Sequence, residues 1–151
     1  MDAFNNLLMG FAVALSPSNI TFAFAGSVLG TLIGVLPGIG PSAGAAILIP
    51  LTFNMDPTGA IIMLSALYYG TQYGGTITSV LLNVPGEAAS AITCLDGYAL
   101  AKQGKAGTAL SLAAIGSFVG GLFATLCLVV AAIPLAKMAL QFGPVEFFAL
   151  L

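Results

Sequence analysis

An uninterrupted apolar stretch, residues 108–133, constrains this chain more than any other feature. A transmembrane helix needs about 20 consecutive apolar residues, and this stretch is long enough to supply them. Charged residues make up only 5% of the whole chain and hydrophobic residues 59%, whereas a soluble domain carries roughly 25% charged residues. Such a chain cannot cover a water-facing surface, so we predict an all-α, polytopic membrane protein.

Proline and glycine interrupt the first long apolar region. Apolar residues run over 20–36 and again over 42–51, and Pro37, Gly38, Gly40 and Pro41 lie between the two runs. No helix continues cleanly through such a sequence. Irregular backbone at membrane depth is tolerated only where it is buried in protein or lines a cavity. We therefore expect a discontinuous or re-entrant transmembrane helix, made of two pieces around a broken centre.

A second interruption is expected further along the chain. Pro57 suits the first turn of a helix, and Asp56 suits its positive end. This helix then meets the small and hydroxyl residues 70–76, after which an apolar stretch ends at Leu82. The pattern predicts two more helical pieces with a polar interruption at 70–76.

The remaining segments complete the domain organisation. Residues 1–17 indicate an N-terminal interfacial helix, and residues 18–151 a transmembrane domain. The most polar part, residues 86–106, indicates an amphipathic connection at the membrane surface. Pro134 is expected to close the span that begins at residue 108. A further apolar stretch runs from Val145 to the last residue, from which we expect the chain to be a fragment.

Glycines recur at intervals of four residues. Gly26, Gly30 and Gly34 follow this spacing, and so do Gly116 and Gly120 in the long apolar stretch. Small residues on one helix face let another backbone approach closely, which is how membrane helices pack. The spacing predicts helix packing at these positions. For the first three glycines, ordinary packing and a sliding transport core both stay open.

The first interruption has the features of an anion site. Pro41 suits the first position of a helix, and the backbone N–H groups after it would then point into the break. A helix N-terminus with free N–H groups attracts anions, and discontinuous helices form such sites in secondary transporters. Glycine lets a carboxylate approach the backbone. The predicted substrate-binding residues here are Gly38, Gly40, Pro41, Ser42, Ala43 and Gly44. A proline kink without a ligand is the alternative.

The second interruption offers little bulk and several oxygen atoms. Oxygen donors and unwound carbonyls suit a hard cation such as Na⁺. We expect further substrate contacts at Gly74, Gly75 and Thr76, and ion contacts at Thr78, Ser79 and Asn83. The alternative is that these hydroxyls bond back to their own helix.

Several chemistries are missing from the sequence. There is no Arg and no basic patch, so nucleic acid is excluded as a partner. There is no His and no Walker A sequence, so Ser–His catalysis, a histidine metal site and ATP binding through a P-loop are excluded. Cys94 and Cys127 lie far apart and show no metal or disulfide pattern. We predict no metal, no cofactor and no enzyme activity.

The few acids and lysines lie outside the apolar stretches. Asp56 and Glu87 sit at turns, where capping of a helix is the expected role. Asp96, Lys102 and Lys105 are expected on a solvated face.

Several motifs occur together and in order: Gly34-Val35-Leu36-Pro37-Gly38-Ile39-Gly40-Pro41, Tyr69-Gly70, Tyr73-Gly74-Gly75 and Asn83-Val84-Pro85-Gly86. In these motifs, from about residue 20 to the end, the chain resembles the large membrane subunit of tripartite tricarboxylate transporters, the TctA family. The resemblance implies a multi-pass permease of the bacterial inner membrane, built as two related halves, of which this chain supplies part of one. It implies a small membrane subunit (TctB-like) and a periplasmic solute-binding protein (TctC-like) as partners. It also implies uptake of citrate-like or other carboxylates coupled to Na⁺ or H⁺.

Three other functions are alternatives to transport. A non-transporting membrane scaffold or small subunit would use its glycines only for packing. An intramembrane enzyme needs a catalytic pair, and Asp56 and Asp96 flank different segments. A channel needs a ring-forming charged or carbonyl filter motif, which the sequence lacks.

Overall fold

The computed structural model describes residues 2–139 and 143. These residues form helices and turns and contain no strand. The apolar stretch from Val145 lies outside the described residues. The helices are α1 (Asp2–Ala14), α2 (Pro17–Gly34), α3 (Gly40–Thr52), α4 (Pro57–Leu82), the 3₁₀ helix η1 (Ala88–Ser90), α5 (Ala91–Lys102) and α6 (Ala106–Ala139). The chain divides into two units, Met1–Ser111 and Leu112–Leu151.

Helices α1 and α2 meet at a sharp bend of 68°. Pro17 begins α2, because its fixed φ suits the first helical position and the N–H it lacks would have no partner there. Asn19 is buried, and its side-chain amide donates to the Val13 carbonyl at 2.8 Å. This bond ties the start of α2 to the end of α1.

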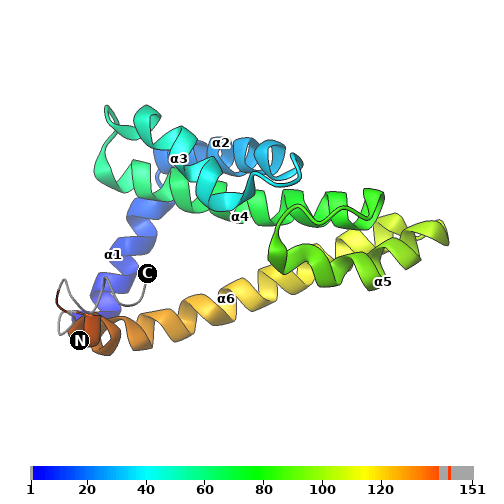
Figure 1. The fold of residues 1–151 in the computed structure, drawn as a ribbon. Helices are drawn as coiled ribbons and strands as arrows, with labels where there is room; N and C mark the ends of the chain where they lie inside the picture. The colour runs from blue at the N-terminus through cyan, green and yellow to red at the C-terminus, as the bar shows by residue number, and fades with distance from the viewer. Residues whose placement is uncertain (1, 140–142, 144–151) are drawn as a thin grey trace. The chain divides into compact units, whose positions relative to one another are not determined.

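Helices α2 and α4 are packed backbone to backbone (Figure 1). A methyl group added at Gly30 would overlap the Leu67 carbonyl oxygen and lie 2.9 Å from the Leu67 Cα. A methyl group at Gly34 would lie 2.7 Å from the Thr71 Cα. Gly26 meets Met63 in the same way. Only glycine fits at these positions of α2.

The glycines of α4 fit into α2 reciprocally. A methyl group at Gly70 would lie 2.9 Å from the Thr31 nitrogen, and one at Gly74 would lie 2.9 Å from the Gly34 Cα. Contacts advance along both helices in the same direction, so α2 and α4 run parallel. Close approach through small residues on both helices is a recurrent packing mode in membranes.

Helix α3 packs against both parallel helices and runs antiparallel to them. Its Gly44 faces Ile33 and Thr71, whereas Leu48, one turn later, packs with Met63 and Leu67 in the buried core. Its 13 residues span only about 20 Å at 1.5 Å per residue, less than the roughly 30 Å of a bilayer core.

Helix α4 is continuous over 26 residues, so the predicted break at residues 70–76 is wrong. The Asp56 carboxylate caps its start by accepting the Gly59 N–H at 2.7 Å, as expected for this acid. The helix ends at Asn83, which has a left-handed φ of 57°. Small residues within 70–76 do not interrupt the helix, because contacts with α2 compensate for the poor helix propensity of glycine.

The polar segment after α4 folds back onto it. Val80 of α4 is fully buried, and a methyl group at Gly97 of α5 would lie 2.8 Å from its side chain. Lys102 and Lys105 at the end of this segment are exposed, as expected for a solvated face.

Helix α6 contains the one described stretch, Ala106–Ala132, that is by itself long and apolar enough to cross a membrane, with a mean hydropathy of 2.2. Helices α1 and α2 would together make a second, bent span. The helix continues through Pro134 to Ala139, so Pro134 does not close it as predicted. Gly116 and Gly120 are exposed, and a methyl group added at either meets nothing within 4 Å among the described residues.

Large apolar side chains cover the outside of the described helices. Phe24 of α2, Phe53 after α3 and Val130 of α6 are 70%, 76% and 81% exposed. A soluble protein rarely exposes apolar patches on this scale. Such a surface requires an apolar solvent, and lipid provides one.

Candidate functional site

The break between α2 and α3 comprises residues 35–39. Gly38 and Gly40 have left-handed φ values of 87° and 68°, which residues with a Cβ rarely adopt. A methyl group at either would meet no atom within 4 Å. These two glycines are required by the conformation of the backbone rather than by crowding.

Helix α3 begins in this break, with its N-terminal turn accessible. Gly40 and Pro41 are half-buried, and Ser42 and Ala43 are exposed. The first N–H groups of a helix have no carbonyl partner within it, and Pro41 has no N–H at all. The backbone N–H groups of Gly40 and Ser42 are therefore those that lack a carbonyl partner within α3.

Gly44 has a different environment from the other residues predicted at this site. It is buried, and a methyl group on it would lie 3.1 Å from the Ile33 side chain and 3.4 Å from that of Thr71. Gly44 thus lets α3 pack against α2 and α4. The expectation that it admits a carboxylate to the backbone is wrong, because protein side chains occupy that space.

The predicted polar cluster of α4 lies on an unbroken helix. The Thr78 and Ser79 hydroxyls both donate to the Gly75 carbonyl, at 2.9 and 2.8 Å, and the Thr76 hydroxyl donates to the Gln72 carbonyl at 3.2 Å. The alternative of hydroxyls bonding back to their own helix therefore describes this segment. Asn83 at the helix end is exposed.

Gly74 and Gly75 face two different neighbours. Gly74 packs against Gly34 of α2, whereas Gly75 faces Gly86 and Glu87 of the segment after α4. Both are buried. Substrate contact at these two glycines was predicted from a helix break that the structure does not contain.

The two Pro–Gly segments of the chain meet at this point. The Gly38 N–H donates to the Gly86 carbonyl at 3.2 Å. Gly86 is buried, and a methyl group on it would overlap the Gly75 Cα and lie 3.1 Å from the Gly34 carbonyl oxygen. We call residues 35–39 and 83–87 the first and second Pro–Gly loops. Their junction joins the α3 N-terminus to the C-terminal third of α4.

Glu87 is the acidic side chain at this junction. Its carboxylate accepts the Ser90 N–H, while its own N–H donates to the Ser90 hydroxyl at 3.2 Å, so Glu87 caps η1 as expected. Its carboxylate also contacts the side-chain amide of Gln72 on α4. With the amide nitrogen facing Glu87, it donates to Oε1 and, at 3.2 Å, to Oε2. Burial raises the pKa of the Glu87 carboxyl above its usual value.

The stability of the chain should depend on pH through Glu87. Because the pKa of this carboxyl is raised by folding, the folded chain holds the proton to higher pH than the unfolded chain. Its stabilising contribution is fully present below the unfolded pKa of about 4.3 and is lost as pH rises through the raised value. We expect the melting temperature in detergent to fall over this pH window in the wild type and not in Glu87→Gln. If the melting temperatures of the wild type and Glu87→Gln changed with pH in the same way, Glu87 would not be the source of the pH dependence.

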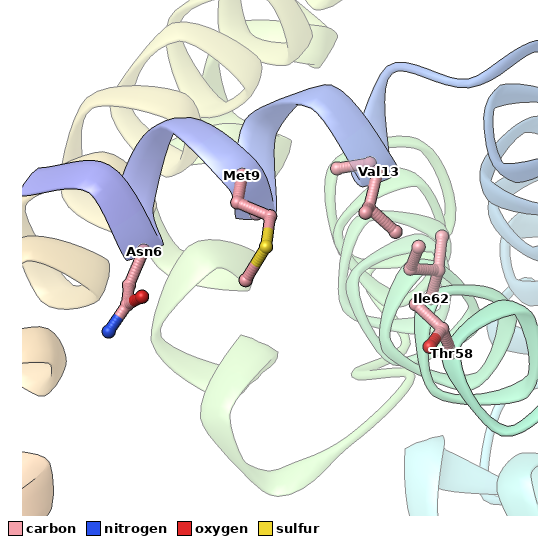
Figure 2. A pocket seen from close by; sticks show the side chains of 7 residues that line it. Asn6, Met9, Val13, Thr58 and Ile62 are labelled. Atoms are coloured by element: carbon pink, nitrogen blue, oxygen red, sulfur yellow. The ribbon is translucent and has the colours of Figure 1, made fainter. Parts of the chain in front are cut away.

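Elsewhere on the first unit, the described residues line apolar grooves, of which three are well formed. One of about 400 Å³ lies between α1 and α4, and Figure 2 shows Val13 of α1 beside Ile62 and Thr58 of α4 on its walls. The others lie along Ser27 and Thr31 of α2 and along the helix α4 residues from Leu64 to Tyr69. None of the three is lined by a residue of the Pro–Gly loops. Their walls suit lipid or apolar protein better than a carboxylate.

The junction of the two Pro–Gly loops thus contains Gln72, Gly86 and Glu87, none of which was predicted to bind a ligand or an ion. A signal for Gly86 was present, because the Pro–Gly pair of the first loop recurs at Pro85 and Gly86. No sequence pattern pairs Gln72 with Glu87, which lie 15 positions apart in the printed chain. Among the residues that the structure describes, no group of His, Cys, Asp and Glu side chains could hold a metal ion.

Comparison with known proteins gives two matches. Residues 20–151 match the family described as the tripartite tricarboxylate transporter TctA family. The chain is 56% identical over 151 residues to an uncharacterized 52.8 kDa protein in the TAR-I ttuC' 3'region of Agrobacterium vitis. That alignment covers 100% of this chain and 30% of the relative, so the chain spans less than a third of that protein's length. No solved structure matches the chain.

Proposed function

Because the chain belongs to the tripartite tricarboxylate transporter TctA family, we propose that it forms part of a permease for tricarboxylates or related carboxylates. The permease is cation-coupled and depends on a binding protein. Its partners are a TctB-like small membrane subunit and a TctC-like periplasmic solute-binding protein, and it resides in the bacterial inner membrane as a multi-pass protein. The apolar surface of α6 supports the membrane location. The activity is that of the whole permease, because the chain spans 30% of its relative.

The observation that supports a substrate site is the accessible N-terminus of α3 at the first Pro–Gly loop. A carboxylate would lie beside Gly38 and Gly40 and accept hydrogen bonds from the N–H groups of Gly40 and Ser42. The Ser42 hydroxyl would be a further donor. The helix dipole adds to this attraction. The open space around Gly38 and Gly40 leaves room for the anion. Substrate binding is thereby proposed at the turn where α2 ends and α3 begins.

The α3 N-terminus can be tested with a matched pair of glycines. Gly40→Leu should lower uptake about tenfold or more, because losing a hydrogen bond to a charged group costs about 1.5–3 kcal/mol. Gly104→Leu is the control. Gly104 also has a positive φ, 77°, and open space around it, but it lies between α5 and α6. Both variants thus meet the same backbone strain, and Gly104→Leu should transport nearly as well as the wild type.

The measurement is uptake of radiolabelled citrate, with and without a Na⁺ or pH gradient. Vesicles would hold the full-length permease, its small subunit and the matched binding protein. Equal uptake by the two variants at equal membrane content would move the substrate site away from Gly40. A wild type that takes up no member of a wider carboxylate panel would overturn the proposed function.

One observation favours a second function, a non-transporting scaffold. Backbone contact between α2 and α4 through Gly26, Gly30 and Gly34 is what packing alone requires. A scaffold predicts that Gly26 and Gly30 matter and that Ser42 does not. Ser42→Ala in the same uptake assay separates the two functions: reduced uptake with normal insertion supports the permease, and unchanged uptake supports the scaffold.

A further inference from the structure

The Glu87 carboxylate lies where four parts of the chain come together. It follows directly after Gly86, it caps η1 through Ser90, and its Cγ would lie 3.7 Å from a methyl group on Gly75 of α4. The Gly86 carbonyl next to it holds the Gly38 N–H of the first Pro–Gly loop. Two residues after Gly38 the α3 helix begins. A movement of Glu87 can therefore reach the loop that leads into α3 through a single hydrogen bond, the one from the Gly38 N–H to the Gly86 carbonyl.

Glu87 and Gln72 can form a hydrogen bond in either protonation state of the acid. An ionised carboxylate only accepts, so the Gln72 amide must present its nitrogen, as described above. A protonated carboxyl donates, and the amide then presents its oxygen after turning by half a rotation. The pair thus has two hydrogen-bonded arrangements that differ by one proton and one amide orientation.

No charged neighbour fixes Glu87 in its ionised form. Burial is the cause that raises its pKa, with no charged side chain of the described residues opposing it. Helices α2 and α3 and the first Pro–Gly loop have no titratable side chain. Next to the pair, α4 carries Tyr73, and α5 carries Cys94, whose thiol donates to the Ser90 carbonyl, and Asp96, which is exposed. The carboxyl is thus free to gain and lose a proton.

We propose that Glu87, paired with Gln72, is the proton-binding site of this transporter, and that its protonation state controls the first Pro–Gly loop through Gly86. This inference rests on the proposed function. The carboxylate takes a proton from water on one side of the membrane and returns it to water on the other, and no other bond is made or broken. A proton is favoured over Na⁺ because a hard cation takes several oxygen ligands, whereas one carboxylate is enough for a proton, and no group of three or more His, Cys, Asp and Glu side chains lies together among the described residues.

Gradient-driven uptake tests the proposal. Proteoliposomes would hold the full-length permease, its small subunit and the binding protein, with radiolabelled citrate and an imposed pH gradient. Glu87→Gln keeps an acceptor for Ser90, so it should fold. Its citrate accumulation driven by the pH gradient should fall about tenfold or more, within the range usual for coupled sites, while citrate exchange without a gradient persists. Asp96→Asn, which removes an exposed acid of α5, should behave as the wild type.

A second measurement does not depend on transport. Infrared difference spectra of the detergent-solubilised permease should show a carboxyl group that titrates above the usual glutamate range, and this signal should be absent from Glu87→Gln. Accumulation by Glu87→Gln equal to the wild type overturns the coupling role and leaves the proposed function standing. A Glu87 signal that titrates as an ordinary glutamate overturns the proton site even where citrate is not the substrate. If the wild type itself takes up no citrate, that result counts against the proposed function alone.

Discussion

Gly30→Ala is expected to destabilise the protein by about 3 kcal/mol, at the upper end of what overpacking a close contact costs. The added methyl group would overlap the Leu67 carbonyl oxygen and lie 2.9 Å from the Leu67 Cα. Both are backbone atoms of α4, so no side chain can rotate away, and the two helices must separate. A separation at this point also loosens Gly26 and Gly34 on the same face.

The expected result is a fall in melting temperature of about 6–12 °C for a chain of this size, measured in mild detergent by size-exclusion of a fluorescent fusion. Gly107→Ala is the control. Gly107 also lies in a helix, α6, but a methyl group on it meets nothing within 4 Å. Alanine has a higher helix propensity than glycine by about 1 kcal/mol or less, so this variant should be as stable as the wild type or slightly more so. Equal melting temperatures for the two variants would contradict the packing of α2 on α4.

Gly86→Ala is expected to separate the two Pro–Gly loops while leaving the helices packed. Its methyl group would overlap the Gly75 Cα and lie 3.1 Å from the Gly34 carbonyl oxygen, so the second loop must move off α4. The Gly38–Gly86 hydrogen bond is then lost. If the strain of about 1–3 kcal/mol falls on the transport-competent state, uptake should drop about 5–150-fold.

The matched control for Gly86→Ala approaches the same contact from its other side. A methyl group at Gly75 would lie 3.4 Å from the Gly86 Cα, which is ordinary van der Waals contact, so Gly75→Ala should keep most of its uptake. Membrane insertion should be near the wild-type level in both variants. The melting temperature should be near the wild-type value in Gly75→Ala and about 2–12 °C lower in Gly86→Ala, whose methyl group overlaps backbone atoms. Normal uptake by Gly86→Ala would show that the junction of the loops is not needed for transport.

The sequence was sufficient to predict an all-helical membrane chain and a break at residues 37–41, which the structure places at residues 35–39. Proline and glycine determine backbone conformation locally, and the positive φ of Gly38 and Gly40 is a local requirement. The Asp56 cap is local as well. These features could be predicted because they depend on neighbours within a few residues.

The second break could not be excluded from sequence. Glycines and hydroxyl residues interrupt a helix in water, but here Gly70 and Gly74 contact the backbone of α2 and the hydroxyls bond to carbonyls of α4 itself. Tertiary packing decided the outcome. The helix through Pro134 follows the same logic, because an apolar solvent favours any helix that keeps most of its backbone bonds.

The candidate site was predicted in part only. The α3 N-terminus was expected as an anion site and is accessible, whereas Gly44 and Gly74 pack against protein. The junction of Gly75, Gly86 and Glu87 depends on where α4 ends and how the chain then turns, which involves contacts between distant segments. Re-entrant topology and the two-repeat architecture stay predictions.

The parallel pairing of α2 and α4 imposes an order of assembly during synthesis. Two antiparallel helices can pair as soon as the second one emerges, but the partner of Gly30 is Leu67, which is made about 40 residues later, or roughly 2–8 seconds at 5–20 residues per second. Until then the glycine face of α2 is uncovered in the membrane. The return of α3 must precede the pairing, since it brings the chain back to the end where α4 starts. A slow stretch of translation after α4 would give this chain time to close, and its absence would favour wrong partners for that face.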